Sequence, residues 1–312
     1  MSAQYLNDAS YRPCFSGHET FPLRYGWLQK AYFAVSSAAS PKEAVHIFRD
    51  QDAIARFGVG RNMVSAIRYW ATAAGIIDEF SDGLSVSWIG DMLFGEAGLD
   101  PYLEDDSSLW LLHWHLASRP RLTSVYWLFN EYRGGSFVRS DLVSALLEMA
   151  NENEWSRVAS TTVDRDLQCL LRTYIGGRGS SDAGDSILAE LGLIRPVDKQ
   201  RSRLSRGRKL SLPDQIFLFC LKEFWRDTAE EQSSLSFENI AYSPGSPGKV
   251  FLLDEEDIVD RLERLEEVSK GALAWSETAG IRQVNRRSRT STEDDRGMLR
   301  DALSLMRGLE AA

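Results

Sequence analysis

Cysteine is scarce in this sequence, and long apolar runs are missing. The 312 residues include three cysteines, Cys14, Cys169 and Cys220, which stand far apart and form no C-x-x-C pair. They alone cannot build a disulfide framework or a structural zinc site. The longest apolar run, Ile216 to Leu221, has six residues, against the roughly 20 that a membrane-spanning helix needs. We therefore expect no membrane association and a cytoplasmic location.

Familiar catalytic motifs are absent as well. The sequence contains no P-loop, no G-x-G-x-x-G after a strand, no G-x-S-x-G and no H-E-x-x-H. Nucleotide hydrolysis, dinucleotide redox chemistry, serine hydrolysis and zinc proteolysis therefore lack support. The P-D-x-n-D/E-x-K pattern of many nucleases is also missing. An enzymatic activity would have to depend on residues outside these motifs.

Positive charge is in deficit overall but concentrated in one place. With 36 basic and 45 acidic residues the chain carries a formal charge of −9, which opposes a general attraction to nucleic acid. Between Arg195 and Lys209, however, seven basic residues and one acidic residue give a local charge of +6. This cluster predicts a polyanion site, because counterion release needs several basic groups together; a solvated loop is the alternative. A smaller basic cluster follows at Arg282, Arg286, Arg287 and Arg289.

A helix-turn-helix pattern lies in the first third of the chain. Apolar residues at i, i+4, i+7, i+8 and i+11 predict an amphipathic helix over residues 61–74. A short helix over residues 52–57 precedes it across a Gly-Val-Gly turn, and Asp82-Gly83 predicts a hairpin between two following strands. This order is typical of a winged helix, whose second helix contacts DNA. The predicted DNA-facing residues of that helix are Arg61, Asn62, Ser65 and Arg68.

The same order recurs about one hundred residues later. The apolar spacing repeats over residues 163–174 after a predicted helix over 140–149. A strand entry at 191–194 and a return strand at 209–212 place the basic cluster at the tip of a second wing, where phosphates are contacted. The residues predicted to bind DNA here are Thr162 and Arg165 on the helix, and Lys199, Arg201, Arg203, Arg206, Arg208 and Lys209 on the wing.

These patterns, with 14 Phe, 10 Tyr and 9 Trp available for a large core, predict a mainly α (α+β) fold. It consists of tandem winged-helix-like units with small β wings and a helical C-terminal part. The predicted boundaries are 1–135, 136–228 and 229–312, in keeping with a length of two or three domains. The alternative is that the spacing arises by chance, or that the units serve only as scaffolds.

Two groups of residues are candidates for catalysis. His18 and Glu19 lie in a loop, where they would act as base and orienting group or join a metal. Glu104 and Asp105, just before a predicted helix, are candidate ligands of Mg²⁺ or Mn²⁺. If the protein cuts DNA, we expect these four residues to meet in space. The alternatives are a hydrogen-bonded loop that fastens the N-terminus to the first unit, and a helix N-cap.

Several strings resemble a bacterial family of unknown function whose genes lie beside a PAPS-reductase-like sulfur-transfer protein and an ATPase in DNA phosphorothioation clusters. The resemblance is densest over residues 15–135. It rests on residues 16–28 (SGHETFPLRYGWL), 58–64 (GVGRNMV) with 67–70, 100–105 (DPYLED) with 109–114, and 127–130 (WLFN).

The resemblance implies a role in replacing a non-bridging phosphate oxygen of DNA with sulfur, a mark used in antiphage defence. Double-stranded DNA, the sulfurtransferase and the ATPase are the implied partners, and the sequence is also compatible with a homodimer. One member of the family nicks DNA. Two functions remain open: a metal-dependent nicking endonuclease, and a non-catalytic DNA-binding adaptor that recruits the sulfur-transfer and ATPase partners.

Overall fold

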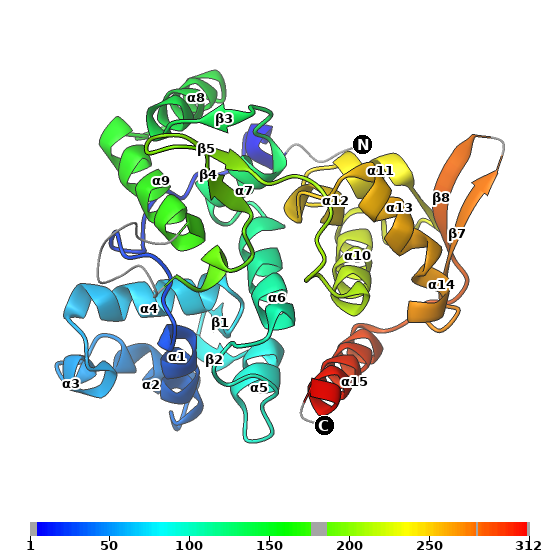
Figure 1. Ribbon diagram of the computed structural model, residues 1–312. Coiled ribbons are helices and arrows are strands. Elements are labelled where there is room, and N and C mark those ends of the chain that lie inside the picture. Colours follow the sequence, from blue (N-terminus) through cyan, green and yellow to red (C-terminus); the bar gives the residue numbers. More distant parts are fainter. Residues whose placement is uncertain (1–4, 176–185, 279, 311–312) are drawn as a thin grey trace.

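The computed structural model describes residues 5–175, 186–278 and 280–310. Helices dominate, and the described strands form three small antiparallel sheets, which confirms the predicted mainly α (α+β) class (Figure 1). The α-helices are α1 Trp27–Ser36, α2 Pro41–Ile47, α3 Ala53–Phe57, α4 Arg61–Ala73, α5 Trp88–Phe94, α6 Asp106–Ala117, α7 Thr123–Asn130, α8 Arg139–Glu152, α9 Ser160–Ile175, α10 Asp214–Ala229, α11 Phe237–Tyr242, α12 Pro247–Val250, α13 Glu255–Glu263, α14 Leu265–Val268 and α15 Thr292–Glu310. Two short 3₁₀ helices are η1 Tyr5–Asn7 and η2 Ile187–Ala189.

The strands pair within three separate parts of the chain. β1 pairs with β2, β5 lies between β3 and β4, and β8 lies between β6 and β7. Every described pairing is antiparallel. The strands are β1 Ile77–Phe80, β2 Gly83–Val86, β3 Ser136–Phe137, β4 Ile194–Pro196, β5 Ser202–Leu204, β6 Ser234–Ser236, β7 Leu273–Thr278 and β8 Ile281–Arg286.

The elements predicted for the first unit are present. Helix α3 ends at Gly58, whose φ of 67° lies in the left-handed region that favours glycine. Helix α4 follows and buries Ile67 and Trp70, as its apolar spacing predicted. The β1–β2 hairpin then turns at Asp82. The order of helix, turn, helix and hairpin is therefore confirmed.

The second unit contains β3, α8, α9, β4 and β5 in that order. The predicted return strand at residues 209–212 is wrong, because β5 spans Ser202–Leu204 and pairs with β4. Residues 209–212 instead lead into α10: Lys209 is buried and Leu210 is 89% exposed, the reverse of the predicted alternation. The hairpin is consequently shorter than predicted, and its tip spans residues 197–201.

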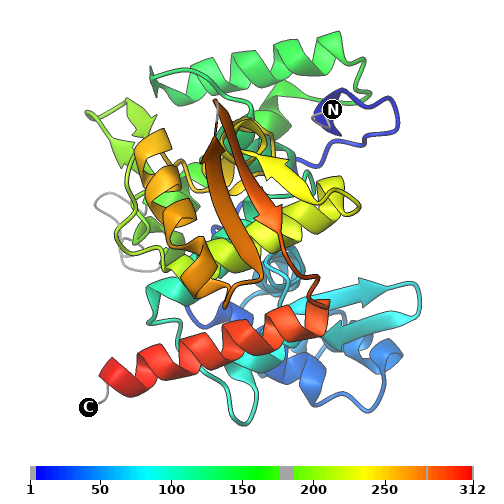
Figure 2. The same ribbon diagram turned by 90° about the vertical axis from the view of Figure 1, so that its right-hand side faces the viewer.

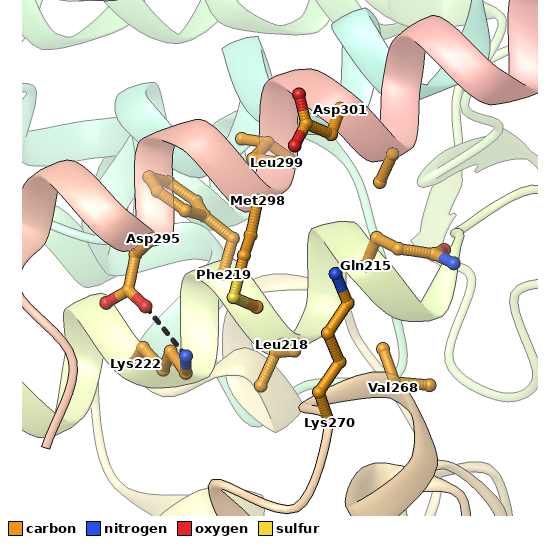
Figure 3. A pocket seen from close by; sticks show the side chains of 11 residues that line it. Gln215, Leu218, Phe219, Lys222, Val268, Lys270, Asp295, Met298, Leu299 and Asp301 are labelled. Carbon is orange, nitrogen blue, oxygen red and sulfur yellow. Dashed lines mark hydrogen bonds and ion pairs between the residues drawn. The ribbon is translucent and has the colours of Figure 1, made fainter. Parts of the chain in front are cut away.

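The C-terminal part, which was predicted to be helical, also contains the β6–β8–β7 sheet. Helix α15 lies across the molecule below the β7–β8 hairpin (Figure 2). Buried Asp295 fixes it to α10 by ion pairs with Lys222 (2.7 Å) and Arg226 (2.5 Å). A cavity of 330 Å³ lies between the two helices, with the Lys222–Asp295 pair on its wall (Figure 3).

One contiguous apolar cluster reaches from Leu6 to Leu303 and takes residues from all three predicted units. The units therefore pack on a shared core, while their boundaries stay a prediction. In the part of the chain that the structure describes, no helix has the length and apolar character to span a bilayer.

Candidate nucleic-acid interface

The N-terminal segment around His18 lies between α4 and α9, the two helices predicted to contact DNA (Figure 1). The His18 imidazole is buried and its Nε2 is 2.9 Å from Oδ1 of Asp166 on α9. The ring also stacks on Trp70 of α4, with centroids 6.3 Å apart, and meets the edge of Tyr69 at 5.7 Å. One side chain thus contacts both helices.

The hydrogen bonds of His18 define its tautomer. Its Nδ1 accepts the backbone N–H of Thr20 at 3.0 Å. The proton therefore sits on Nε2, which donates to the Asp166 carboxylate. Both ring nitrogens are engaged within the protein, and neighbouring Glu19 is exposed to solvent instead of orienting the ring. These contacts are those of the alternative interpretation, a loop that fastens the N-terminus to the first unit.

Two further contacts extend this seam. The Phe21 carbonyl accepts hydrogen bonds from Trp70 Nε1 of α4 (2.9 Å) and from Cys169 Sγ of α9 (3.1 Å). The Leu23 N–H donates to Thr173 Oγ1 of α9 at 3.4 Å. We call residues 16–23 the N-terminal clamp, because they join α4 to α9 through buried polar contacts.

The carboxylates predicted to hold a metal have other surroundings. Asp105 caps α6, with Oδ1 accepting the Ser107 N–H at 2.7 Å, as the N-cap alternative predicted. Buried Asp100 accepts the backbone N–H groups of Glu104 and Asp105, and the Glu104 side chain is exposed.

The four predicted catalytic residues do not gather as a group of metal ligands. Within residues 5–175, 186–278 and 280–310, no three His, Cys, Asp or Glu side chains gather as metal ligands would. His18, Glu19, Glu104 and Asp105 therefore do not form the expected joint metal site, because His18 is committed to Asp166 and Asp105 to the start of α6.

The predicted face of α4 is largely open to solvent. Arg61, Asn62 and Ser65 are exposed. Arg68 is half-buried and forms an ion pair with Glu79 of β1, with Nη2 2.6 Å from Oε1. On α9, Arg165 is exposed and Thr162 is half-buried, so both helices present part of the predicted set. The candidate residues on these two helices are accessible, and Arg68 already forms an ion pair with Glu79.

Most of the basic cluster lies on or beside the β4–β5 hairpin. Lys199 and Arg201 occupy the tip, and Arg206 and Arg208 follow β5; all four are exposed. Arg208 is paired with Asp260 at 3.0 Å. The cluster is therefore spread along the hairpin instead of being confined to its tip.

Two arginines of the hairpin lie directly opposite each other. Arg195 of β4 and Arg203 of β5 are cross-strand partners and both are exposed. Partners in a register point to the same face, where like charges destabilise a sheet. The one acidic residue of the stretch, Asp198, accepts the backbone N–H groups of Gln200 and Arg201 in the tip.

Lys209 differs from the other members of the cluster. It is 8% exposed, and its ammonium group donates to the carbonyls of Ser205, Gly207 and Leu252. Burial lowers the pKa of Lys209 to about 8, and the charge of Arg195 contributes in the same direction. The prediction of Lys209 as a DNA contact is therefore corrected: it holds the chain between β5 and α10.

Two basic residues that sequence reasoning missed join the cluster. Arg206 donates to the carbonyl of Tyr132, next to Arg133, at 3.4 Å. Burial, followed by the positive charges of Arg206 and Arg133, lowers the pKa of Lys249, while the charge of Glu131 opposes this shift. Arg133 lies between α7 and β3 and Lys249 lies in α12, so nothing in the linear sequence connects them with the hairpin. We define the basic face as Arg133, Arg195, Lys199, Arg201, Arg203, Arg206 and Lys249.

The side chains of the second basic cluster are engaged by neighbouring residues. Arg282 lies over the Phe237 ring at 3.6 Å, and Arg286 lies over Trp225 at 4.3 Å. Arg287 pairs with Glu266, and Arg289 with Glu231. These side chains hold the C-terminal sheet to its surroundings, so they do not form a second open polyanion site.

Solved structures of other proteins share this architecture. A solved structure described as magnesium ion-bound SspB is 28% identical, covers 96% of this chain and 99% of that chain, and has a TM-score of 0.79. A second SspB crystal structure is 27% identical with the same coverage and a TM-score of 0.76. No curated protein matches the sequence. The family model described as Protein of unknown function (DUF4007) matches residues 15–302. The chain therefore belongs to the DUF4007 family, and it is similar to SspB in sequence and fold.

Proposed function

We propose that this protein is a DNA-binding component of a DNA phosphorothioation system and contacts the duplex backbone through the basic face. The observation that carries the proposal is the exposed Arg195–Arg203 pair. Two facing arginines oppose folding, and a phosphate between them would reduce their repulsion and accept charge-assisted hydrogen bonds from both. The overall charge of −9 favours this local site over general attraction to polyanions.

We assign the sequence contacts to α4 and α9. The order β3, α8, α9, β4, β5, with β5 between the other two strands, supports the winged-helix interpretation of the second unit. In that arrangement α9 would approach a major groove with Thr162 and Arg165, while the hairpin follows phosphates. Arg61, Asn62, Ser65 and Arg68 of α4 would extend the contact, because the N-terminal clamp links α4 to α9.

The similarity to SspB supports a role beside the sulfurtransferase and ATPase of the same system. A protein that binds the duplex would deliver these partners to the phosphate that is modified. We propose double-stranded DNA in the cytoplasm as the target. We also propose that the protein forms a homodimer, which sedimentation of the same preparations would test.

Strand nicking is the second candidate function, and the solved SspB structure with bound magnesium favours it. Mg²⁺ or Mn²⁺ would then be the cofactor. The described side chains do not supply a matching donor set, so no catalytic step is assigned to them. Supercoiled plasmid incubated with the protein and either cation separates the two functions, because a nickase yields open circles and an adaptor leaves the plasmid supercoiled.

The binding proposal is tested by the salt dependence of duplex affinity, measured by fluorescence anisotropy. The variant Arg195→Ala with Arg203→Ala removes both side chains that would hold the phosphate between them. It should flatten the slope of log K against log salt by up to about 0.9, the value for one neutralised phosphate. The matched control is Arg287→Ala with Arg289→Ala, which removes the same charge from two exposed ion pairs elsewhere. Equal slopes for the two variants would overturn the proposal.

A further inference from the structure

A cavity of 390 Å³ opens beside α4, next to the face proposed to contact DNA. Its volume falls in the range of about 300–1,000 Å³ that is usual for ligand sites. Ser65 and Arg68 of α4 belong both to this cavity and to the exposed face of the helix. A group bound here would therefore be continuous with DNA lying along α4.

Three guanidinium groups and one carboxylate border the cavity. Arg68 is paired with Glu79, at 2.6 Å. Arg49 and Arg121 are exposed, and no hydrogen bond or ion pair joins the guanidinium group of either to a residue that the structure describes. Two arginines are thus available to an anion, and guanidinium groups bind phosphate oxygens in a bidentate manner.

The remaining wall suits an organic group more than a bare phosphate. Tyr69 lines the cavity and offers an aromatic surface, on which nucleobases stack. The Thr72 side chain lines the same cavity, and its Oγ1 is buried without a hydrogen-bond partner among the described residues. A ligand with a ring and a hydrogen-bonding edge would satisfy both.

We infer that this cavity holds one nucleotide of DNA displaced from the duplex, with its phosphate on Arg49 and Arg121 and its base beside Tyr69 and Thr72. The inference rests on the proposed DNA-binding function and names the part of the substrate that enters the protein. An extrahelical base gives access to the adjoining backbone, and taking a base out of the stack costs a few kcal/mol. Two charge-assisted phosphate contacts are of the size needed to offset that cost.

The first test uses the four deoxynucleoside monophosphates and inorganic phosphate as probes in calorimetry with the full chain. At least one nucleotide should bind more tightly than phosphate. Arg49→Ala with Arg121→Ala should weaken it about a hundredfold or more, since two contacts to a charged group are lost and each costs about 1.5–3 kcal/mol. Arg49→Lys with Arg121→Lys keeps the charge and should fall between the two. The control Arg287→Ala with Arg289→Ala should bind as the wild type does; equal affinity for all variants would overturn the inference.

The second test asks whether the nucleotide comes from DNA. A set of duplexes, each with 2-aminopurine at one position, is titrated while anisotropy reports binding. Unstacking should raise the fluorescence of at least one duplex with wild-type protein but not with the double alanine variant. Duplex binding without any fluorescence rise would overturn the inference and leave the proposed function intact. Nucleotide binding without duplex binding would instead overturn the proposed function and show a site for free nucleotides.

Discussion

Substitutions at the His18–Asp166 pair distinguish a structural clamp from a catalytic base. Both side chains are buried, with exposed fractions of 4% and 7%, and they share a hydrogen bond of 2.9 Å. Asp166→Ala leaves the His18 Nε2–H without an acceptor, which costs about 1–3 kcal/mol of unfolding free energy. His18→Ala also removes the ring that packs on Trp70 and Tyr69, so it should cost about 2–5 kcal/mol.

Asp166→Asn is the matched control. The Asn side-chain oxygen can still accept the Nε2–H, because the other His18 nitrogen is already bound to the Thr20 amide. This variant should stay within about 1 kcal/mol of the wild type, since the hydrogen bond is kept. A catalytic base that depended on the Asp166 carboxylate would behave differently, because an Asp to Asn change beside a catalytic histidine lowers rates by orders of magnitude.

Urea unfolding of the wild type, the two alanine variants and their combination provides a double-mutant cycle. Contacting buried residues should show a coupling of about 0.5–3 kcal/mol. A coupling below about 0.3 kcal/mol, the error of additivity for independent sites, would refute the clamp. Normal stability of Asp166→Asn together with loss of plasmid nicking would restore His18 as a catalytic base.

Two other predictions concern buried positions. Burial lowers the pKa of His113 from 6.5 to about 4. Between these two pH values the unfolded chain binds a proton at His113 and the folded chain does not. The free energy of unfolding should therefore decrease as the pH is lowered from 6.5 to 4, by up to about 1.4 kcal/mol per pH unit. His113→Gln should flatten that slope in urea unfolding at successive pH values, and an unchanged slope would contradict the assignment. Gly17 has a φ of 118° and an added Cβ would lie 2.5 Å from Tyr69, so Gly17→Ala should cost about 1–3 kcal/mol. Gly135→Ala, with open space around the added Cβ, should not alter the unfolding midpoint.

The fold was predictable where the pattern is local. The apolar spacing of α4 and α9 and the Asp82-Gly83 turn each depend on residues within about three helical turns of one another, and all three are present. The return strand of the second wing was misplaced because its choice depends on pairing between β5 and distant β3, with Ser136 opposite Arg203. Alternating letters at residues 209–212 imitate a strand although Lys209 faces inward.

The site was less predictable, because its residues meet across long separations. His18 and Asp166 are 148 positions apart, and no local motif marks Asp166 as the partner of a loop histidine. Arg133 and Lys249 likewise join Arg206 only through packing of α12 and the segment after α7. Charge density in the sequence did identify the hairpin, but it also identified the arginines between Arg282 and Arg289, which contact aromatic rings and carboxylates.

The contacts of the clamp give the Ser16–Pro22 motif a structural role. A loop containing His and Glu suggests chemistry, yet its buried contacts go to α4 and α9. The Phe21 carbonyl contacts both helices, and the Leu23 amide adds a separate contact to α9. Because several bonds must break before the helices can move apart, their exposed faces keep a fixed separation. Two helices held in this way would meet DNA as one rigid surface, so weakening the clamp should reduce affinity even though no clamp residue needs to contact DNA.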